Sequence, residues 1–294
     1  MMRLEYMFFR LFFSFVSIIP LRLLYPLSDI FSYILQYIVR YRKVTVVKNL
    51  RNSFPEKSEN EIKRITHSYY RNLCDVSLES IKGFSLTLDQ FDKRYKCLNP
   101  EVANEYFDKG QSVIFALSHC ANWEWGTQVA NSIFLHDAIS FYKPLSNKYI
   151  DSYIRKHRES RGIVLCSIYQ TKFIFRSEDN IPRAYFLVSD QSPGGTNKVH
   201  WVRFLNQDTA CLHGIESYAR MFDLPVIYAD VQRVDRGCYT VVLEVLSSTP
   251  KDTQKGEITE RYMKKLEEII VEKPEDWLWS HKRWKIKKLI ESLT

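Results

Sequence analysis

The chain has 294 residues, of which 45% are hydrophobic and 26% are charged. This composition excludes a disordered protein, and the length is enough for a domain with a large hydrophobic core. The formal net charge of +8 at pH 7 favours anionic partners. A mean hydropathy of -0.28 excludes a protein built mainly of membrane-spanning helices.

Residues 7–39 are rich in apolar and aromatic side chains. A membrane-spanning helix needs about 20 consecutive apolar residues, whereas Arg10, Arg22 and Asp29 interrupt this run. No small-residue cleavage site follows it, so a signal peptide fits poorly. A kinked anchor, a helix lying in the membrane surface and a buried helical hairpin are the alternatives. We expect residues 1–45 to attach the protein to a membrane and residues 46–294 to form the main domain.

Two groups of basic residues stand out along the chain. The first comprises Arg40, Arg42, Lys43, Lys48 and Arg51, and the second comprises Lys282, Arg283, Lys285, Lys287 and Lys288. Nucleic acid, anionic lipid head groups and an acidic carrier protein are all compatible with such groups. A solvated surface without a partner is an equally good interpretation of either group alone.

The six cysteines are scattered, without a C-x-x-C spacing. Neither a disulfide framework nor a zinc site is therefore expected, and we interpret the cysteines as reduced thiols. No metal ion or other cofactor is predicted from any spacing of histidine, cysteine and acidic residues.

The pattern of helices and strands after residue 57 predicts an α/β fold. Ser58-Glu59-Asn60-Glu61 matches a capping box, which begins a helix that we expect to end near Gly83. Seven runs are typical of strands: residues 113–118, 138–142, 162–168, 184–189, 199–205, 225–231 and 239–245. Helical stretches separate most of them, which favours a mixed, largely parallel sheet flanked by helices. Functional residues of such sheets lie in loops beyond the strand ends.

One of these strand ends carries a histidine followed by a carboxylate. The run 113–118 leads into His119, and Asn122 is suited to cap the next helix. Glu124 could fold back and bond one ring nitrogen, so that the other nitrogen accepts a proton from a hydroxyl group. The carboxylate would also stabilise the imidazolium, as in a catalytic triad. A histidine at a strand end is more often only structural, so the pattern alone leaves both interpretations open.

Other chemistry finds less support in the sequence. Cys120 adjoins His119, but neighbours in an extended segment point to opposite faces, which argues against a Cys–His nucleophile pair. The chain contains no H-E-x-x-H, G-x-S-x-G, P-loop or G-x-G-x-x-G motif. This argues against zinc peptidases, α/β-hydrolases, NTPases and dinucleotide-binding proteins.

Several motifs, in order along the chain, resemble those of the lipid A late acyltransferases (lauroyl and myristoyl transferases). His119 to Glu124 is similar to the H-x4-D/E signature of glycerolipid and lipid A acyltransferases. The stretch with Tyr142, Lys143, Pro144, Asn147, Asp151 and Arg158 resembles the family's Y-R-P…N…D…R pattern, and Asp190-Gln191 resembles its Asp-Gln or Asp-His loop. Residues 274–285, PEDWLWSHKRWK, are close to its P-E-x-x-x-W-x-H-x-R-[FW]-K signature. The chain departs from the family at Lys143, usually arginine, and at Asn206, commonly glycine.

The resemblance implies transfer of a fatty acyl group from acyl carrier protein to a hydroxyl of a lipid A precursor, in lipopolysaccharide biosynthesis. His119 would be the general base, oriented by Glu124, with no covalent acyl-enzyme. Substrate-binding roles would fall to Asn122, Tyr142, Lys143, Arg158, Asp190, Gln191 and Arg283. Residues 46–294 would be the catalytic domain, with a glycerolipid acyltransferase-like sheet.

The same resemblance places the protein at the cytoplasmic face of a bacterial inner membrane. An acidic carrier, a phosphorylated glycolipid acceptor and an anionic membrane surface would all favour its basic residues. Alternative acceptors with the same chemistry are a lysophospholipid, an aminolipid and a phosphatidylinositol mannoside. A non-catalytic lipid-binding protein is another alternative. A nucleic-acid partner is not expected, because no DNA- or RNA-binding motif accompanies the basic groups.

Overall fold

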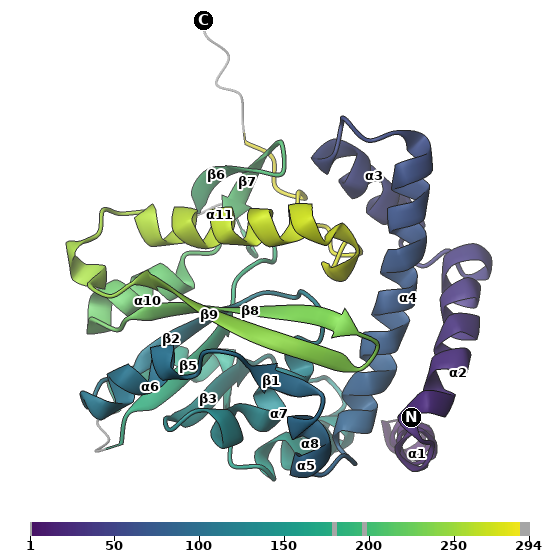
Figure 1. The fold of residues 1–294 in the computed structure, drawn as a ribbon, viewed down its shortest axis with the longest axis horizontal. Helices are drawn as coiled ribbons and strands as arrows, with labels where there is room; N and C mark the ends of the chain where they lie inside the picture. The colour runs from purple at the N-terminus through teal and green to yellow at the C-terminus, as the bar shows by residue number, and fades with distance from the viewer. Residues whose placement is uncertain (1, 178–180, 196–198, 289–294) are drawn as a thin grey trace, which may run out of the picture.

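The computed structural model describes residues 2–177, 181–195 and 199–288. Within these residues the centre is a seven-stranded sheet with the order β1-β9-β8-β2-β5-β3-β4 (Figure 1). All strand pairs from β8 to β4 are parallel, whereas β9 runs antiparallel to β8 and β1 is parallel to β9. The prediction of an α/β fold with a mixed, largely parallel sheet is confirmed.

The strands of the sheet follow the predicted runs closely. They are β1 Tyr95–Cys97, β2 Val113–Leu117, β3 Asp137–Tyr142, β4 Val164–Ser167, β5 Arg183–Val188, β8 Val226–Asp235 and β9 Cys238–Ser247. The predicted run 199–205 forms β6 His200–Phe204, which pairs with β7 Gln207–Cys211 in a separate antiparallel hairpin. Two strands were not predicted from the sequence, because β1 has only three residues and β7 begins with polar ones.

The helices are α1 Met2–Ile18, α2 Leu21–Tyr33, α3 Lys43–Ser53, α4 Glu59–Gly83, α5 Leu88–Asp92, α6 Glu101–Asp108, α7 Trp123–Ile133, α8 Lys148–Glu159, α9 Thr171–Arg176, α10 Gly214–Phe222 and α11 Glu257–Glu272. The predicted capping box at Ser58 and Glu61 is present at the start of α4. Gly83 ends α4, as predicted. A Cβ atom there would lie 2.8 Å from the Trp125 Nε1 atom, so glycine allows α4 to approach α7 closely.

The sheet separates two hydrophobic layers. Ile114 and Ala116 of β2 belong to the layer that contains residues of α4, α10 and α11. Val113, Phe115 and Leu117 of the same strand belong to the layer that contains residues of α6 and α7. All five residues of β2 are buried, as expected for a central parallel strand covered on both faces. Figure 1 shows α11 on one side of the sheet and α7 on the other.

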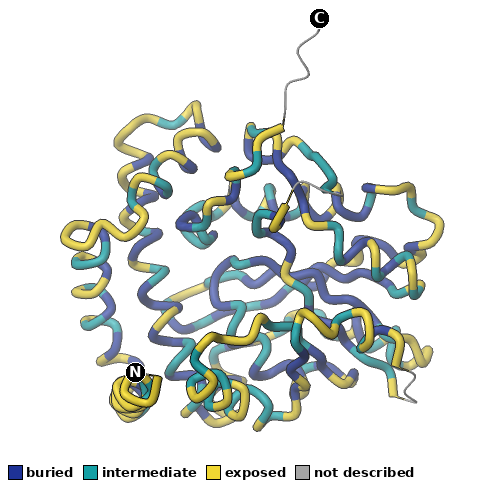
Figure 2. Tube along the Cα trace, turned by 180° about the vertical axis from the view of Figure 1, so that it is seen from behind, coloured by how far each residue is buried: buried dark blue, intermediate teal, exposed yellow. Residues whose placement is uncertain are grey.

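The N-terminal helices pack against the body of the protein. Phe13 is buried, and Val16, Leu21 and Leu24 join the hydrophobic layer that contains Phe115. The outer surface of α1 is exposed (Figure 2). Among the helices of the described residues, none is long and apolar enough to cross a membrane, so a membrane-spanning anchor in residues 1–45 is not supported.

A buried carboxylate joins α2, α4 and the turn between β8 and β9. Asp75 of α4 is 1% exposed, and its Oδ2 atom lies 2.6 Å from Arg233 Nη2 and 2.8 Å from Arg236 Nε. Arg236 also contacts Asp29 of α2 at 2.6 Å. Buried charges need such partners, because removal of one partner leaves the other desolvated and unpaired.

We predict that Asp75→Ala lowers the free energy of unfolding by about 3–5 kcal/mol, because it leaves the Arg233 guanidinium buried without its carboxylate. Urea unfolding at pH 7, followed by far-UV circular dichroism, measures the change. Asp92→Ala, at an exposed position, is the control and should change stability by less than about 0.5 kcal/mol. Equal effects of the two substitutions would contradict the structural role of Asp75.

Candidate active site

The ends of two neighbouring parallel strands bring His119 and Asp190 together. Leu117, the last residue of β2, is opposite Val188, the last residue of β5. His119 and Asp190 each lie two residues beyond these ends, at the same edge of the sheet. His119 donates to Asp190 twice, from its backbone nitrogen to Oδ2 at 2.8 Å and from its ring Nδ1 to Oδ1 at 2.6 Å.

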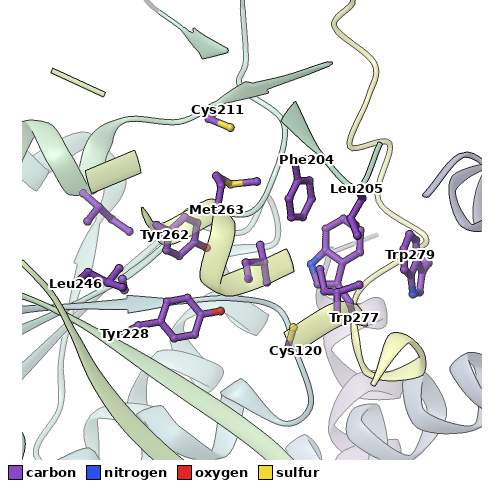
Figure 3. Packing of buried hydrophobic residues seen from close by; sticks show 14 of the residues in the cluster. Cys120, Phe204, Leu205, Cys211, Tyr228, Leu246, Tyr262, Met263, Trp277 and Trp279 are labelled. Carbon is purple, nitrogen blue, oxygen red and sulfur yellow. The ribbon is translucent and has the colours of Figure 1, made fainter. Parts of the chain in front are cut away.

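The C-terminal segment completes the surroundings of the Asp190 carboxylate. Trp277 Nε1 donates to Asp190 Oδ2 at 2.9 Å, and both side chains are buried. The backbone of Trp277 forms a β-bridge with Cys120, and Ala121 N donates to the Asp276 carbonyl at 2.9 Å. Ala121 has a φ of 49°, a left-handed conformation that is costly for a residue with a Cβ atom. Figure 3 shows Trp277 packed near Cys120 and Phe204.

The contact between His119 and Asp190 shifts their pKa values in opposite directions. Burial acts to raise the pKa of Asp190, but the charge of His119 and the hydrogen bonds it donates outweigh burial and lower it to about 2. Burial acts to lower the pKa of His119, whereas the charge and hydrogen bond of Asp190 raise it, with a net increase. The carboxylate is therefore ionised at neutral pH and favours the imidazolium form of the ring.

His119 lines a pocket, and its other ring nitrogen contacts Gln191. Since Nδ1 donates to Asp190, the neutral ring carries its lone pair on Nε2, which accepts from the Gln191 amide at 3.2 Å. The ring stands edge-on to Trp123, with 4.9 Å between ring centroids. The histidine side chain is 18% exposed in a pocket of about 260 Å³. A hydroxyl group that enters this pocket can replace the amide on Nε2 and give up its proton.

The walls of this pocket combine a helix face with the C-terminal segment. Residues 275–278 of the C-terminal segment line one part of it. The lining residues from α4 are Tyr69, Asn72, Leu73, Val76, Ser77 and Ser80. Trp123 also lines a second, narrow cavity, between α7 and the sheet, with mostly apolar walls that include Leu117, Phe134 and Phe186. Trp123 thus stands between the pocket at His119 and the apolar space beneath α7.

The predicted contact between Glu124 and His119 is wrong. Glu124 Oε1 lies 2.5 Å from both Nε and Nη2 of Arg158 on α8. The physical reason is the start of α7 at Trp123, because the helix directs Glu124 toward α8 and not back toward the strand end. Asp190, which comes from the adjacent strand, is the carboxylate that orients the imidazole.

Two residues predicted to bind substrate are structural. Asn122 is fully buried; its Oδ1 accepts from Trp125 N, which confirms the predicted helix cap, and its Nδ2 donates to Glu79. Arg283 is 1% exposed and donates to the Ala210 carbonyl of β7 at 2.7 Å. Neither side chain reaches a surface that substrate could contact.

The remaining predicted residues lie near β3 and the edge strand β4. The Tyr142 hydroxyl donates to Asp151 Oδ2 at 3.3 Å, and Lys143 is exposed after the end of β3. The Arg158–Glu124 pair is partly exposed. Only Asp190 and Gln191 of the predicted binding residues contact His119 directly.

Among the described residues, no three His, Cys, Asp or Glu side chains are grouped as a metal site requires. The six cysteines are free.

Sequence reasoning missed one residue that supports this site. His281 Nε2 accepts from the backbone nitrogen of Ser192 at 3.0 Å, directly after Asp190-Gln191. An accepting Nε2 requires neutral imidazole, and burial lowers the pKa of His281, which favours that form. His281 therefore fixes the loop that holds His119. In the sequence, only its place in the C-terminal motif singled out His281. Its contact with Ser192 joins segments that are far apart in the chain, so no local pattern could predict it.

Comparison with known families settles what kind of protein carries this site. A family model described as bacterial lipid A biosynthesis acyltransferase matches residues 3–286. The chain belongs to this family. It is therefore an acyltransferase, an enzyme that transfers acyl groups, and the family acts in lipid A biosynthesis. A search of curated proteins gives no match.

We predict that Asp190→Asn shifts the acid limb of the pH profile of this acyltransferase to lower pH. The Asp190 charge raises the pKa of His119, so the wild-type base loses its proton only above the ordinary histidine value of about 6.5. The amide lacks this charge, and kcat at neutral pH should fall about a hundredfold or more, because the imidazolium is no longer stabilised. Steady-state rates from pH 5 to 9, roughly the histidine range, measure both effects. An acid limb unchanged by the substitution would contradict the coupling.

We predict that His281→Leu lowers kcat, whereas His281→Gln retains most of it. Leucine leaves the partly buried Ser192 N–H without its acceptor, which costs up to about 1–3 kcal/mol of unfolding free energy and loosens the Asp190 loop. The glutamine side-chain oxygen can accept in place of Nε2. Thermal unfolding and steady-state kinetics are compared for both variants. Loss of kcat in the glutamine variant equal to that in the leucine variant would argue against the positioning role.

Proposed function

We propose that the protein moves a fatty acyl chain from the thioester of an acyl carrier protein to a hydroxyl of a lipid A precursor. The observation that carries this proposal is the His119 ring at the pocket, which Asp190 holds through Nδ1, so that Nε2 is the nitrogen left to take up a proton. The acceptor hydroxyl gives its proton to Nε2 while its oxygen attacks the thioester carbonyl carbon. The carbon–sulfur bond of the tetrahedral intermediate then breaks, and the imidazolium returns the proton to the leaving thiolate.

Direct attack by the acceptor accounts for the side chains around His119. Cys120 is buried, and burial raises the pKa of its thiol well above the ordinary value, so it is a poor nucleophile. Ser77 and Ser80 line the pocket, but their hydroxyls donate to carbonyls of their own helix. Neither therefore offers the hydrogen bond to His119 that an activated nucleophile needs.

Gln191 is our candidate for stabilising the oxyanion. Its amide nitrogen lies 3.2 Å from Nε2, which places a donor next to the position of the reacting carbonyl. When the acceptor hydroxyl displaces the amide from Nε2, the N–H groups can turn to the oxygen that gains negative charge. Preformed donors of this kind stabilise tetrahedral intermediates. Removal of one such donor typically lowers kcat by about a hundredfold to a thousandfold.

The narrow cavity beneath α7, with a volume of only about 20 Å³, is our candidate for the start of an acyl-chain channel, which would have to widen when the chain enters. It adjoins the catalytic pocket at Trp123, and its walls are mostly apolar. An apolar chain gains free energy when it leaves water for such a space.

The basic groups support a negatively charged donor and acceptor. They are far apart in the sequence, but Arg42 donates to the Ser280 carbonyl at 3.1 Å and Asn49 donates to the His281 carbonyl at 3.0 Å. Arg40, Lys48, Lys282 and Lys285 are exposed on these adjoining segments. Since His281 supports the Asp190 loop, this surface lies beside the catalytic pocket. Arg158, whose Nη1 is not used in its contacts with Glu124, is a candidate for binding an acceptor phosphate.

We further propose that the enzyme works on the cytoplasmic face of a bacterial inner membrane, where acyl carrier protein and lipid A precursors meet. The exposed apolar side chains of α1 support contact with a membrane surface. Buried residues of α1 and α2 belong to the core, so their deletion would disturb the fold. Substitution of surface residues is the better test of membrane contact.

We predict that His119→Ala abolishes acyl transfer, because no other group takes the hydroxyl proton; the expected loss in kcat is about a hundredfold to ten-thousandfold. Mass spectrometry of lipids from cells that carry wild type or variant identifies the acceptor. His67→Ala, at an exposed histidine, is the control. Full activity of the His119 variant would overturn the mechanism. Loss of an acyl chain from another lipid, with lipid A unchanged, would replace the acceptor by that lipid.

A further inference from the structure

A groove between α1 and α8 lies outside the catalytic pocket. It has a volume of about 830 Å³ and is open to solvent. Tyr6 and Arg10 of α1 form one wall, and Lys148, Tyr153 and Lys156 of α8 form much of the other. Arg158, also on α8, contacts Glu124, so the groove residues and the active-site contact occupy different parts of this helix.

The groove is positively charged. Arg10, Lys148 and Lys156 line it, and none of the described residues that line it is acidic. Two carboxylates lie near the groove but outside its lining: Glu5 accepts from the Asn147 amide at 3.0 Å, and Asp151 accepts from Leu145 N at 2.7 Å. The lining itself carries three basic side chains and no acidic one among the described residues.

Neutral aromatic groups hold the arginine of the groove in place. The Arg10 guanidinium lies 4.4 Å from the centroid of the Tyr153 ring and donates to the Tyr6 hydroxyl at 3.1 Å. Arg3 donates to Tyr149 at 3.1 Å in the same way. Stacking on a ring orients a guanidinium without neutralising its charge. Arg10 can therefore offer its remaining N–H groups to a phosphate oxygen.

An apolar stripe runs along α1 beside this groove. Leu4, Phe8, Leu11, Phe15 and Ile18 recur at helical spacing, and each is more than half exposed. Arg3 and Arg10, two helical turns apart, lie between this stripe and the face that packs on α8. A helix with an apolar stripe flanked by basic side chains is suited to the boundary between lipid head groups and acyl chains.

We propose that the α1–α8 groove binds the phosphate of an anionic lipid head group while the stripe on α1 enters the apolar layer. The inference rests on the proposed work at a membrane surface and names the lipid chemistry that this surface recognises. The combination of charge, stacked arginine and adjoining apolar stripe favours a lipid over a soluble anion. Lipid bound here would hold α8, and with it Arg158 and Glu124, next to the bilayer.

Sedimentation with vesicles tests the charged half of the site. Wild-type protein should bind vesicles of phosphatidylcholine mixed with phosphatidylglycerol much more strongly than vesicles of phosphatidylcholine alone. The variant Arg10→Gln/Lys148→Gln/Lys156→Gln should bind the anionic vesicles about tenfold to a hundredfold more weakly. The matched control Lys251→Gln/Lys255→Gln/Lys264→Gln removes the same charge from exposed positions elsewhere and should bind like wild type. Equal losses in the two variants, or no preference of wild type for anionic vesicles, would overturn the proposal.

Two further measurements separate the sources of the phosphate and the roles of the two halves. Phe8→Ser/Leu11→Ser should weaken binding to both kinds of vesicle, and unchanged binding would exclude the stripe from the membrane contact. Calorimetry with inorganic phosphate should show no saturable binding. Saturable binding that is lost in the groove variant, without vesicle binding by wild type, would replace the lipid by a soluble anion.

The catalytically inactive His119→Ala variant distinguishes this inference from the proposed function. It should bind anionic vesicles like wild type, because the groove does not involve His119. If wild type binds anionic vesicles but transfers no acyl chain to any lipid, the proposed reaction is wrong, whereas the proposed lipid-binding role of the groove is supported. If wild type transfers an acyl chain but shows no preference for anionic vesicles, the lipid-binding role of the groove is wrong, whereas the proposed reaction is supported.

Discussion

The buried carboxylate of Asp190 is the interaction on which the catalytic end of this protein depends. It is 2% exposed and accepts from the His119 backbone, the His119 ring and the Trp277 indole. Each hydrogen bond to a charged group contributes about 1.5–3 kcal/mol, which offsets the desolvation of the carboxylate. The three donors come from the loop after β2 and from the C-terminal segment, so a single charge fixes segments that are far apart in the sequence.

The same arrangement gives a structural role to three side chains of the C-terminal segment. Trp277 donates to Asp190, His281 accepts from Ser192, and Arg283 donates to β7. Trp277 and His281 hold the loop that carries Asp190, and Arg283 fastens the segment to β7. The order and chemistry of a motif can therefore indicate the correct family while most of its residues have structural roles. Asn122, between Glu79 and the start of α7, is a further example.

The N-terminal helices link the catalytic domain with the surface proposed to face the membrane. Their inner residues are part of the core, and Asp29 of α2 joins the buried network of Asp75 and Arg236. The outer face of α1 carries exposed apolar residues (Figure 2). Under the proposed membrane contact, a helix fixed to the body in this way would set the orientation of the active site relative to the membrane without a flexible linker. The groove shared with α8 extends this contact toward Arg158.

Local patterns in the sequence determined much of the architecture. The capping residues Ser58 and Asn122, the end of α4 at Gly83 and most strands were predicted, because these features depend on neighbouring residues. His119 was correctly placed at a strand end. Tertiary structure decided its partner: Glu124 is close in the sequence, but α7 turns it to Arg158, whereas the parallel register of β2 and β5 brings Asp190 to the ring. It also decided the burial of Arg283 and the contact of His281, since strand register, helix direction and packing bring together residues that no short-range pattern connects.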